Sequence, residues 1–187
     1  MAIDGVDGVD GSGKTTFADE LAPIVEQSGR QVIRSSVDGF HNPRDVRYNR
    51  GKCDPHGFFY DSYNYGDLRQ FLLDPFKCGA GTVDTARFDH RVDHAVKVTK
   101  SVSPSAVLLL DGIFLHREEL RNCWDFSIFL DVPFAVSYSR MAIRDQCNPD
   151  PLSPENHRYY EGQNIYLRTC TPALRASIVI DNSASIF

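Results

Sequence analysis

The chain has 187 residues, 42% of them hydrophobic and 24% charged, which suits one globular domain with a sizeable core. Its net charge of −5 argues against a nucleic-acid partner bound through bulk basic charge, and its longest apolar run, about residues 106–110, is too short for a membrane span. Five scattered cysteines without a C-x-x-C pair argue against a disulfide framework or a zinc site and favour a reducing cytoplasm.

The N-terminal part of the chain predicts a strand–loop–helix–strand unit. Met1–Val6 is expected to be a strand and Gly8–Gly13 a glycine-rich loop. Lys14–Gln27 is expected to be a helix, because its apolar residues recur at steps of three and four. Gln31–Val37 is the second expected strand. Such a βαβ unit predicts a parallel sheet.

The rest of the chain continues the alternation without a domain boundary. Asp38–Asn64 is expected to be irregular, and a loop of that length usually carries function. The later expected elements are a helix at Gly66–Leu73, a β excursion at Thr82–Thr99, a buried strand at Ala106–Leu110, a short helix at Glu118–Asn122, a strand at Phe126–Val132, a helix at Pro133–Asp145, a loop at Cys147–Pro154, a helix at Glu155–Arg168 and a strand at Ser177–Ile180. Residues 1–187 are therefore expected to form one α/β domain.

A phosphate-binding motif follows the first expected strand. Gly8–Thr15 reads GVDGSGKT and fits G-x-x-x-x-G-K-[ST] in full, between a strand and a helix. Glycines let successive N–H groups point at one anion, Lys14 reaches the β- and γ-phosphates, and Thr15 is a ligand for Mg²⁺. The alternative is a glycine-rich turn that binds nothing. The expected ATP-binding residues are Gly8, Asp10, Gly11, Ser12, Gly13, Lys14, Thr15 and Thr16.

Asp38 stands at the carboxyl end of the second expected strand, where open α/β sheets bind ligands. A carboxylate there can accept the proton of an attacking hydroxyl, but an aspartate before Gly39 is also a common turn residue. The aromatic residues of Phe58–Tyr63 suit a sugar or a hydroxylated ring, and they suit a small hydrophobic lid equally well.

Three more polar groups are candidates for the same site. The run Ala86–Arg91, with sequence ARFDHR, would hold a substrate hydroxyl or phosphate, or form a solvated turn. Asp111 follows an apolar strand, a placement that often holds Mg²⁺ through water but also occurs without metal. Arg140 and Arg144 share one helix face and would stabilise phosphate charge, unless Asp145 pairs with one of them.

In this order the motifs resemble the uridine kinase/phosphoribulokinase family of P-loop kinases over nearly the whole chain. The matching pieces are GVDGSGKT at Gly8–Thr15, SVDGF at Ser36–Phe40, GFFYDSYNY at Gly57–Tyr65, RFDHR at Arg87–Arg91, VLLLDGIF at Val107–Phe114, FLDVPF at Phe129–Phe134 and SRMAIRD at Ser139–Asp145. The resemblance implies a P-loop NTPase fold, a three-layer αβα sandwich with a mainly parallel central sheet and a short lid at about 145–156. It also implies ATP and Mg²⁺ as cofactors.

The resemblance also implies roles for individual residues. Asp38 matches a general base that approaches the metal, Asp61 matches an aspartate that contacts a nucleoside ribose, and Asp111 matches the acid after the Walker B strand. The implied catalytic residues are Lys14, Asp38, Arg140 and Arg144. The implied metal ligands are Thr15, Asp38 and Asp111. The implied acceptor-binding residues are Asp38, Phe40, Asp61, Phe88, Asp89, His90 and Arg91.

The sequence also departs from the family pattern. Asp111 stands where uridine kinases usually have Glu, and residues 146–151 form a short lid segment without a basic residue. The segment His41–Arg50, HNPRDVRYNR, carries three arginines near the expected acceptor site. They would bind an anionic acceptor such as a sugar phosphate or a carboxylate, or they form a solvated loop. These differences suggest an acceptor other than uridine.

The expected activity is transfer of the ATP γ-phosphoryl group to a hydroxyl of a nucleoside-like acceptor. Pantothenate or a sugar is the alternative acceptor, and a nucleotide-binding switch or slow ATPase is the alternative class of protein. The expected partner is a small molecule rather than a nucleic acid or a membrane, and the sequence leaves a homo-oligomer open.

Overall fold

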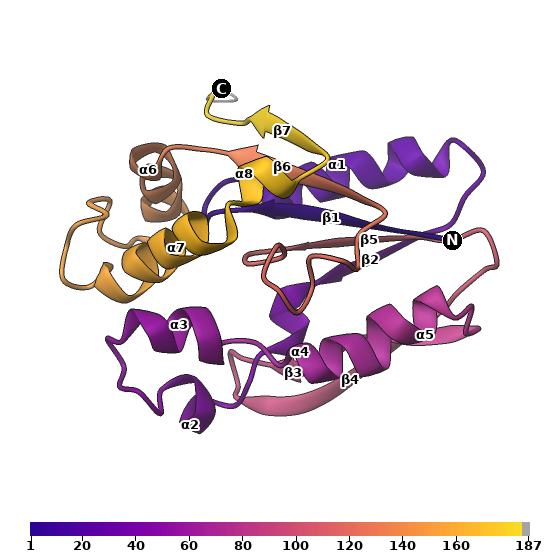
Figure 1. Cartoon of the computed structure of the whole chain (residues 1–187), viewed down its shortest axis with the longest axis horizontal. Helices are drawn as coiled ribbons and strands as arrows, with labels where there is room; N and C mark the ends of the chain where they lie inside the picture. Colours follow the sequence, from indigo (N-terminus) through magenta and orange to yellow (C-terminus); the bar gives the residue numbers. More distant parts are fainter. Residues whose placement is uncertain (185–187) are drawn as a thin grey trace.

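The computed structural model describes residues 1–184 as a parallel sheet with helices on both faces and a separate two-stranded hairpin (Figure 1). The strands are β1 Ala2–Gly8, β2 Val32–Ser36, β3 Thr82–Asp89, β4 His94–Ser101, β5 Val107–Gly112, β6 Phe126–Asp131 and β7 Ile178–Asp181. The helices are α1 Lys14–Glu26, η1 Val37–Phe40, α2 Arg44–Arg47, α3 Pro55–Asp61, α4 Tyr65–Leu68, η2 Arg69–Leu73, α5 Asp74–Lys77, α6 Phe134–Asp145, α7 His157–Cys170 and α8 Pro172–Arg175.

The main sheet has the strand order β2-β5-β1-β6-β7, and each neighbouring pair is parallel. Strand β5 lies between β2 and β1 and is buried along its whole length, as its continuous Val-Leu-Leu-Leu run requires. Asp7 pairs in register with Gly112, and Ser36 pairs with Asp111. The carboxyl ends of β1, β2 and β5 therefore meet at one edge of the sheet.

Each face of the sheet has its own hydrophobic core. Helix α1 covers one face, where Ala18 packs with Val6, Leu109 and Leu130. Helices α3, α4, α5 and α7 lie on the opposite side from α1 and contribute to a larger core (Figure 1). Residues of that core include Phe40, Phe58, Leu68, Leu108, Leu110, Phe114 and Tyr166.

The structure confirms the predicted mainly parallel α/β sheet and most of its elements, but two predictions are wrong. Residues 118–122 form turns rather than a helix. Asp38–Asn64 is not irregular, because it contains α2, α3 and part of η1. Asp54 accepts a hydrogen bond from the Gly57 N–H at 2.6 Å and so caps α3, with Pro55 at its first turn. This capping signal was present in the sequence.

Two further predicted elements are longer than expected. The helix at Gly66–Leu73 extends from Tyr65 to Lys77 through α4, η2 and α5, and Asn64 caps its start by accepting from the Asp67 N–H at 3.0 Å. The β excursion is an antiparallel hairpin of β3 and β4 that ends at Ser101 and has register shifts near Ala86.

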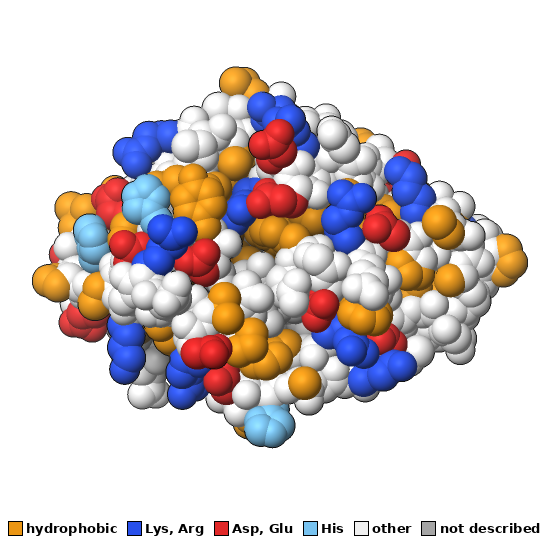
Figure 2. Space-filling view, turned by 60° about the horizontal axis from the view of Figure 1, so that its bottom comes forward, with side chains coloured by type: hydrophobic (Ala, Val, Ile, Leu, Met, Phe, Trp, Pro, Cys, Tyr) orange, Lys and Arg blue, Asp and Glu red, His pale blue; other side chains and the backbone are white. Residues whose placement is uncertain are grey.

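The surface carries charged side chains of both signs, dispersed over the face seen in Figure 2. This mixture agrees with the modest net charge of −5. Among residues 1–184, no helix has the length and apolar character needed to cross a bilayer.

Gly112 fixes how closely β5 approaches η1. A Cβ at this position would lie 2.2 Å from Val37 Cγ1, whereas a Cβ at Gly81 would meet no atom within 4 Å. We predict that Gly112→Ala lowers the free energy of unfolding by about 1–3 kcal/mol through overpacking, and that the control Gly81→Ala leaves it nearly unchanged. Urea denaturation of both variants checks this, and equal stabilities would contradict it.

Candidate active site

The loop between β1 and α1 has the backbone shape of an anion cradle. Gly11 and Gly13 take φ angles of 71° and 88°, in the left-handed region that glycine adopts without steric cost. A Cβ on Gly11 would lie 2.4 Å from the Ser137 carbonyl oxygen, so this position also requires glycine for close packing. The Lys14 ammonium donates to the Val9 carbonyl at 2.8 Å and lies over the loop.

Two side chains from the C-terminal part of the chain hold this loop. The amide oxygen of Gln163, on α7, accepts from the Asp10 N–H at 2.6 Å. The amide nitrogen of Asn182, just after β7, donates to the Ser12 carbonyl at 2.7 Å. Sequence reasoning missed both residues, since neither belongs to a motif and only the fold brings them to the loop.

Thr15 and Asp111 form the oxygen-rich side of the loop. The Thr15 hydroxyl donates to one Asp111 carboxylate oxygen at 2.9 Å, and Arg34 donates to the other at 2.9 Å. Oxygen ligands of this kind fit Mg²⁺, which usually retains waters and shares its remaining ligands with phosphates. Among residues 1–184 no group of three or more His, Cys, Asp or Glu side chains is arranged to hold a metal. A magnesium ion would therefore depend on the nucleotide as well as on Thr15 and Asp111.

Asp38 lies in η1, at the edge of the sheet that carries the phosphate loop. Its carboxylate accepts from the Tyr63 hydroxyl at 3.1 Å, and its backbone carbonyl lies 2.9 Å from the His41 Nδ1. Burial, with the nearby Asp38 charge, raises the pKa of Tyr63 well above its usual value, so Tyr63 stays a hydrogen-bond donor. Burial lowers the pKa of His41, which favours its neutral form.

A cavity of about 230 Å³ lies between Asp38 and the start of α7. Its lining combines carboxylates, arginines, histidines and aromatic rings: Asp10, Asp38, His41, Arg47, Tyr48, Phe58, Ser62, Tyr63, His90, Ile113, Arg158 and Tyr159. We call it the acceptor cavity. Asp10 comes from the phosphate loop, so the loop and the cavity share a wall. Burial raises the pKa of the Asp10 carboxyl group.

The structure brings only some of the expected acceptor residues to this cavity. Asp38 and His90 line it, and the His90 ring lies 4.3 Å from that of His41, centre to centre. Phe40 is packed in the hydrophobic core and does not line the cavity. Asp61 does not line the cavity either, and its carboxylate pairs with Arg50 at 2.8 Å.

The remaining expected acceptor residues belong to the β3–β4 hairpin. Phe88 pairs with Ala95 across it. Asp89 accepts from the Arg91 N–H at 2.9 Å, near the turn. These three residues of the predicted set lie outside the cavity lining.

Arg140 and Arg144 both lie on α6 but contact different partners. Arg140 donates to the Asn182 carbonyl at 2.8 Å and lines a cavity of about 220 Å³ with Gly13 and Thr16. Arg144 is exposed and donates to Asp145 at 2.9 and 2.6 Å, which holds the pKa of Asp145 below its usual value. Arg140 thus lies beside the phosphate loop, while the Arg144 charge acts on Asp10 of that loop.

The segment between α6 and α7 covers residues 146–156 and contains neither a helix nor a strand. Asn156 closes it by donating from its side chain to the carbonyls of Asn148 at 3.0 Å and Asp150 at 2.8 Å. These residues include most of the expected lid.

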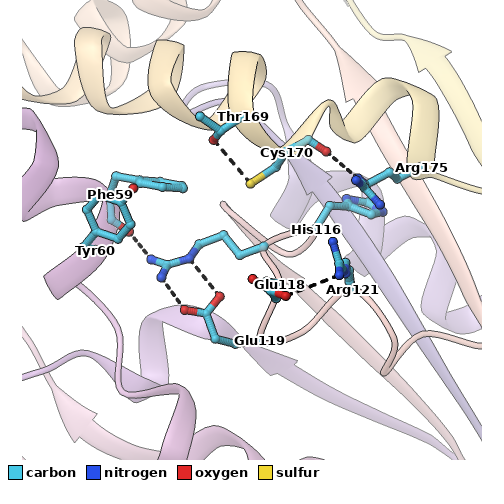
Figure 3. Close-up of a pocket in the computed structure, with 10 residues that line it drawn as sticks. Phe59, Tyr60, His116, Glu118, Glu119, Arg121, Thr169, Cys170 and Arg175 are labelled. Atoms are coloured by element: carbon cyan, nitrogen blue, oxygen red, sulfur yellow. Dashed lines mark hydrogen bonds and ion pairs between the residues drawn. The ribbon is translucent and has the colours of Figure 1, made fainter.

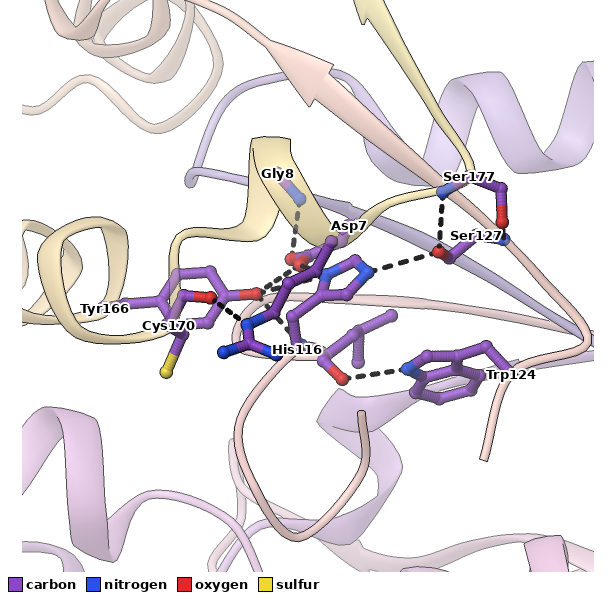
Figure 4. A network of polar contacts seen from close by, with 10 residues as sticks. Asp7, Gly8, His116, Trp124, Ser127, Tyr166, Cys170 and Ser177 are labelled. Carbon is purple, nitrogen blue, oxygen red and sulfur yellow. Dashed lines mark hydrogen bonds and ion pairs between the residues drawn. The ribbon is translucent and has the colours of Figure 1, made fainter. Parts of the chain in front are cut away.

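Asp7 anchors a buried polar network behind the phosphate loop (Figure 4). One carboxylate oxygen accepts from the Gly8 N–H at 2.8 Å. The other lies 2.6 Å from the His116 Nδ1 and accepts from the Tyr166 hydroxyl. The His116 Nε2 lies 3.2 Å from the Ser127 hydroxyl. The network joins β1, the β5–β6 connection, β6 and α7.

A larger cavity, of about 380 Å³, lies between the β5–β6 connection and the ends of α3 and α7 (Figure 3). The Arg117 guanidinium there donates to Glu119 and to the Phe59 carbonyl and lies 4.6 Å from the centre of the Phe59 ring. Its charge is thus satisfied within the protein. No residue of the phosphate loop appears in this lining within the described chain, so the smaller acceptor cavity is the better candidate site.

A parallel sheet that carries a glycine-rich loop and a Thr–Asp pair at its carboxyl edge is the framework of a P-loop kinase. The family model "Phosphoribulokinase / Uridine kinase family" matches residues 3–148. The chain belongs to this family.

Curated relatives are similar over most of the chain. A uridine kinase of Leuconostoc citreum is 26% identical over 147 residues, covering 75% of this chain and 67% of the relative. A uridine kinase of Deinococcus deserti is 29% identical with the same coverages. A pantothenate kinase of an Enterobacter species is 29% identical over 135 residues, covering 65% of this chain and 42% of the relative.

Solved structures show the same fold. A possible uridine kinase from Bacillus stearothermophilus superposes with a TM-score of 0.77 at 27% identity, covering 96% of this chain and 88% of that one. A putative fructose transport system kinase from Silicibacter has a TM-score of 0.76 at 22% identity, with coverages of 96% and 89%. The second likeness supports the fold alone.

The Asp7–His116 pair is buried, with side-chain exposures of 0% and 2%, whereas Asp19 in the Asp19–Arg34 pair is 64% exposed. We predict that Asp7→Ala lowers the free energy of unfolding by about 3–5 kcal/mol, because His116 and Tyr166 lose their buried acceptor. The surface control Asp19→Ala is expected to cost at most about 1 kcal/mol. Chemical denaturation measures both, and a cost for Asp7→Ala as small as that of the control would refute the prediction.

Proposed function

We propose that the protein is an ATP-dependent small-molecule kinase that transfers the γ-phosphoryl group to a hydroxyl of an acceptor bound in the acceptor cavity. The observation that carries this proposal is that the phosphate loop forms part of the wall of the acceptor cavity. Asp10 of the phosphate loop and Asp38 of η1 line the same cavity, so an acceptor hydroxyl there faces both the phosphates and a carboxylate.

The proposed reaction is an in-line displacement. The hydroxyl oxygen forms a bond to the γ-phosphorus while the bond from that phosphorus to the β–γ bridging oxygen breaks, and ADP leaves. Asp38 takes the hydroxyl proton, and Lys14 and the loop N–H groups stabilise the charge on the transferring group. Magnesium, held through Thr15 and Asp111, supplies further charge neutralisation when bound.

A nucleoside-like acceptor is the first candidate, since the similar curated proteins include uridine kinases. Aromatic rings in the cavity wall suit a ring-shaped acceptor: Tyr48, Phe58, Tyr63 and Tyr159. Pantothenate or a sugar is the second candidate. The pantothenate kinase relative supports pantothenate, and the small size of the cavity, about 230 Å³, supports a sugar. A nucleotide-binding switch or slow ATPase would consume ATP without either acceptor.

Lys14→Ala is predicted to reduce acceptor-dependent ADP formation by at least about 100-fold, because it removes a positive charge aimed at the transferring phosphoryl group. The matched control is Lys52→Ala, which removes an exposed lysine outside the site. A coupled assay of ADP release measures both variants. Normal turnover by the Lys14→Ala protein would show that the loop is not the site of phosphoryl transfer.

Asp38→Asn is predicted to retain ATP binding but to lower the rate of transfer by about 100- to 10,000-fold, the usual range for loss of a general base. Asp45→Asn, an exposed position in the same segment, serves as the control. Nucleotide titration and single-turnover kinetics separate binding from chemistry. If Asp38→Asn keeps full activity, Asp38 is not the base.

A further inference from the structure

The acceptor cavity contains a buried arginine without a carboxylate partner. Arg158, at the start of α7, is 4% exposed and lines the cavity. Its guanidinium donates only to backbone carbonyls, those of Gly51 at 3.2 Å, Asp54 at 2.8 Å and Arg47 at 2.9 Å. Over residues 1–184 it forms no ion pair. Its positive charge is therefore not neutralised by a neighbouring acid.

A second buried arginine lies beside it. Arg47 is 9% exposed and lines the same cavity. One of its terminal nitrogens pairs with Asp93 at 3.1 Å, but its Nε is buried and has no hydrogen-bond partner in the described part of the chain. Both guanidiniums lie near the Tyr48 ring, at 5.6 Å for Arg47 and 4.8 Å for Arg158.

The two arginines come from different helices, Arg47 from α2 and Arg158 from α7. Gln163, also on α7, contacts Asp10 of the phosphate loop. Arg158 precedes Gln163 by five residues, which is about 7.5 Å along a helix axis. The cavity therefore combines two carboxylates, those of Asp10 and Asp38, with the guanidiniums of Arg47 and Arg158.

A buried charge without a partner is costly, and a donor without an acceptor adds to the cost. An anion between the two guanidiniums would offset both costs through charge-assisted hydrogen bonds, for which arginine has the matching planar geometry. A neutral nucleoside would leave the Arg158 charge without a carboxylate or phosphate partner. The cavity volume of about 230 Å³ also lies below the usual range for ligand pockets of about 300–1,000 Å³ and favours a compact molecule.

We propose that the acceptor is a compact hydroxy compound that carries a carboxylate or phosphate group. The anionic group binds between Arg47 and Arg158, and the hydroxyl lies toward Asp38, several bonds away. The product is the phosphate monoester of the same anion. This assignment of the acceptor class rests on the kinase function proposed above, but the anion site itself is testable without catalysis.

The first experiment measures anion binding in the Lys14→Ala background, which weakens the competing site in the phosphate loop. Inorganic phosphate and D-glycerate are titrated separately by calorimetry, so that the two kinds of anion are distinguished. Arg47→Gln is expected to weaken binding of at least one probe by about tenfold or more, since it removes charge-assisted hydrogen bonds. Arg44→Gln, an exposed change in the same segment, is expected to leave binding intact.

Failure to bind either probe, or binding that Arg47→Gln does not weaken, would overturn the proposal. Arg158→Lys is a second variant that keeps the charge but loses the planar guanidinium. Circular dichroism and urea denaturation verify that each variant is folded. These binding results do not depend on phosphoryl transfer. If the anion binds at Arg47 but the wild-type protein transfers no phosphoryl group to any acceptor, the kinase function alone is contradicted.

The second experiment compares acceptors that differ in charge. ADP release is measured with D-glycerate against glycerol, ribose 5-phosphate against ribose, pantothenate against panthenol, and with uridine. At least one anionic compound is expected to exceed its neutral partner in kcat/KM by about 100-fold, with the difference reduced by Arg47→Gln. Preference for uridine or for the neutral partners would overturn the anionic acceptor while leaving the kinase function in place.

Discussion

The buried carboxylate of Asp7 holds together three segments that are far apart in the sequence. It accepts hydrogen bonds from the start of the phosphate loop at Gly8 and from Tyr166 on α7, and it pairs with His116 between β5 and β6. A carboxylate at that depth is stable only while such partners surround it. The position of the phosphate loop on the sheet thus depends on the packing of Tyr166 in the C-terminal half of α7, as well as on the glycines of the loop.

Local patterns were enough to predict the sheet and the phosphate loop. The G-x-x-x-x-G-K-[ST] spacing and the apolar run before Asp111 reflect the backbone geometry and burial of single elements. The predicted short helix at Glu118–Asn122 was wrong. Glu119 pairs with nearby Arg117, whose guanidinium also donates to the Phe59 carbonyl on α3, and the segment forms turns around this contact. The capped helix α3 was missed although Asp54-Pro55 signals its start.

The acceptor cavity was harder to predict because its residues come from several elements that meet only after folding. The sequence pointed to three arginines in His41–Arg50 without separating them. In the structure Arg47 enters the cavity, Arg50 pairs with Asp61, and Arg44 is exposed. No local sequence rule distinguishes these three arginines, because which of them enters the cavity depends on how α2 packs against Arg158 of α7. Asp61, which the resemblance placed at a ribose, pairs with Arg50 and does not line the cavity.

Helix α7 contacts both the phosphate loop and the segment that lines the acceptor cavity. Through Arg158 it holds the carbonyls of the segment from Arg47 to Asp54, and through Gln163 it holds the backbone of Asp10. A shift of the helix on binding of one ligand would therefore move the subsite of the other ligand. Thermodynamic linkage makes such an effect reciprocal, so the affinities for nucleotide and acceptor would rise or fall together by the same factor. The 14 residues of one helix would then set the cooperativity between the two substrates.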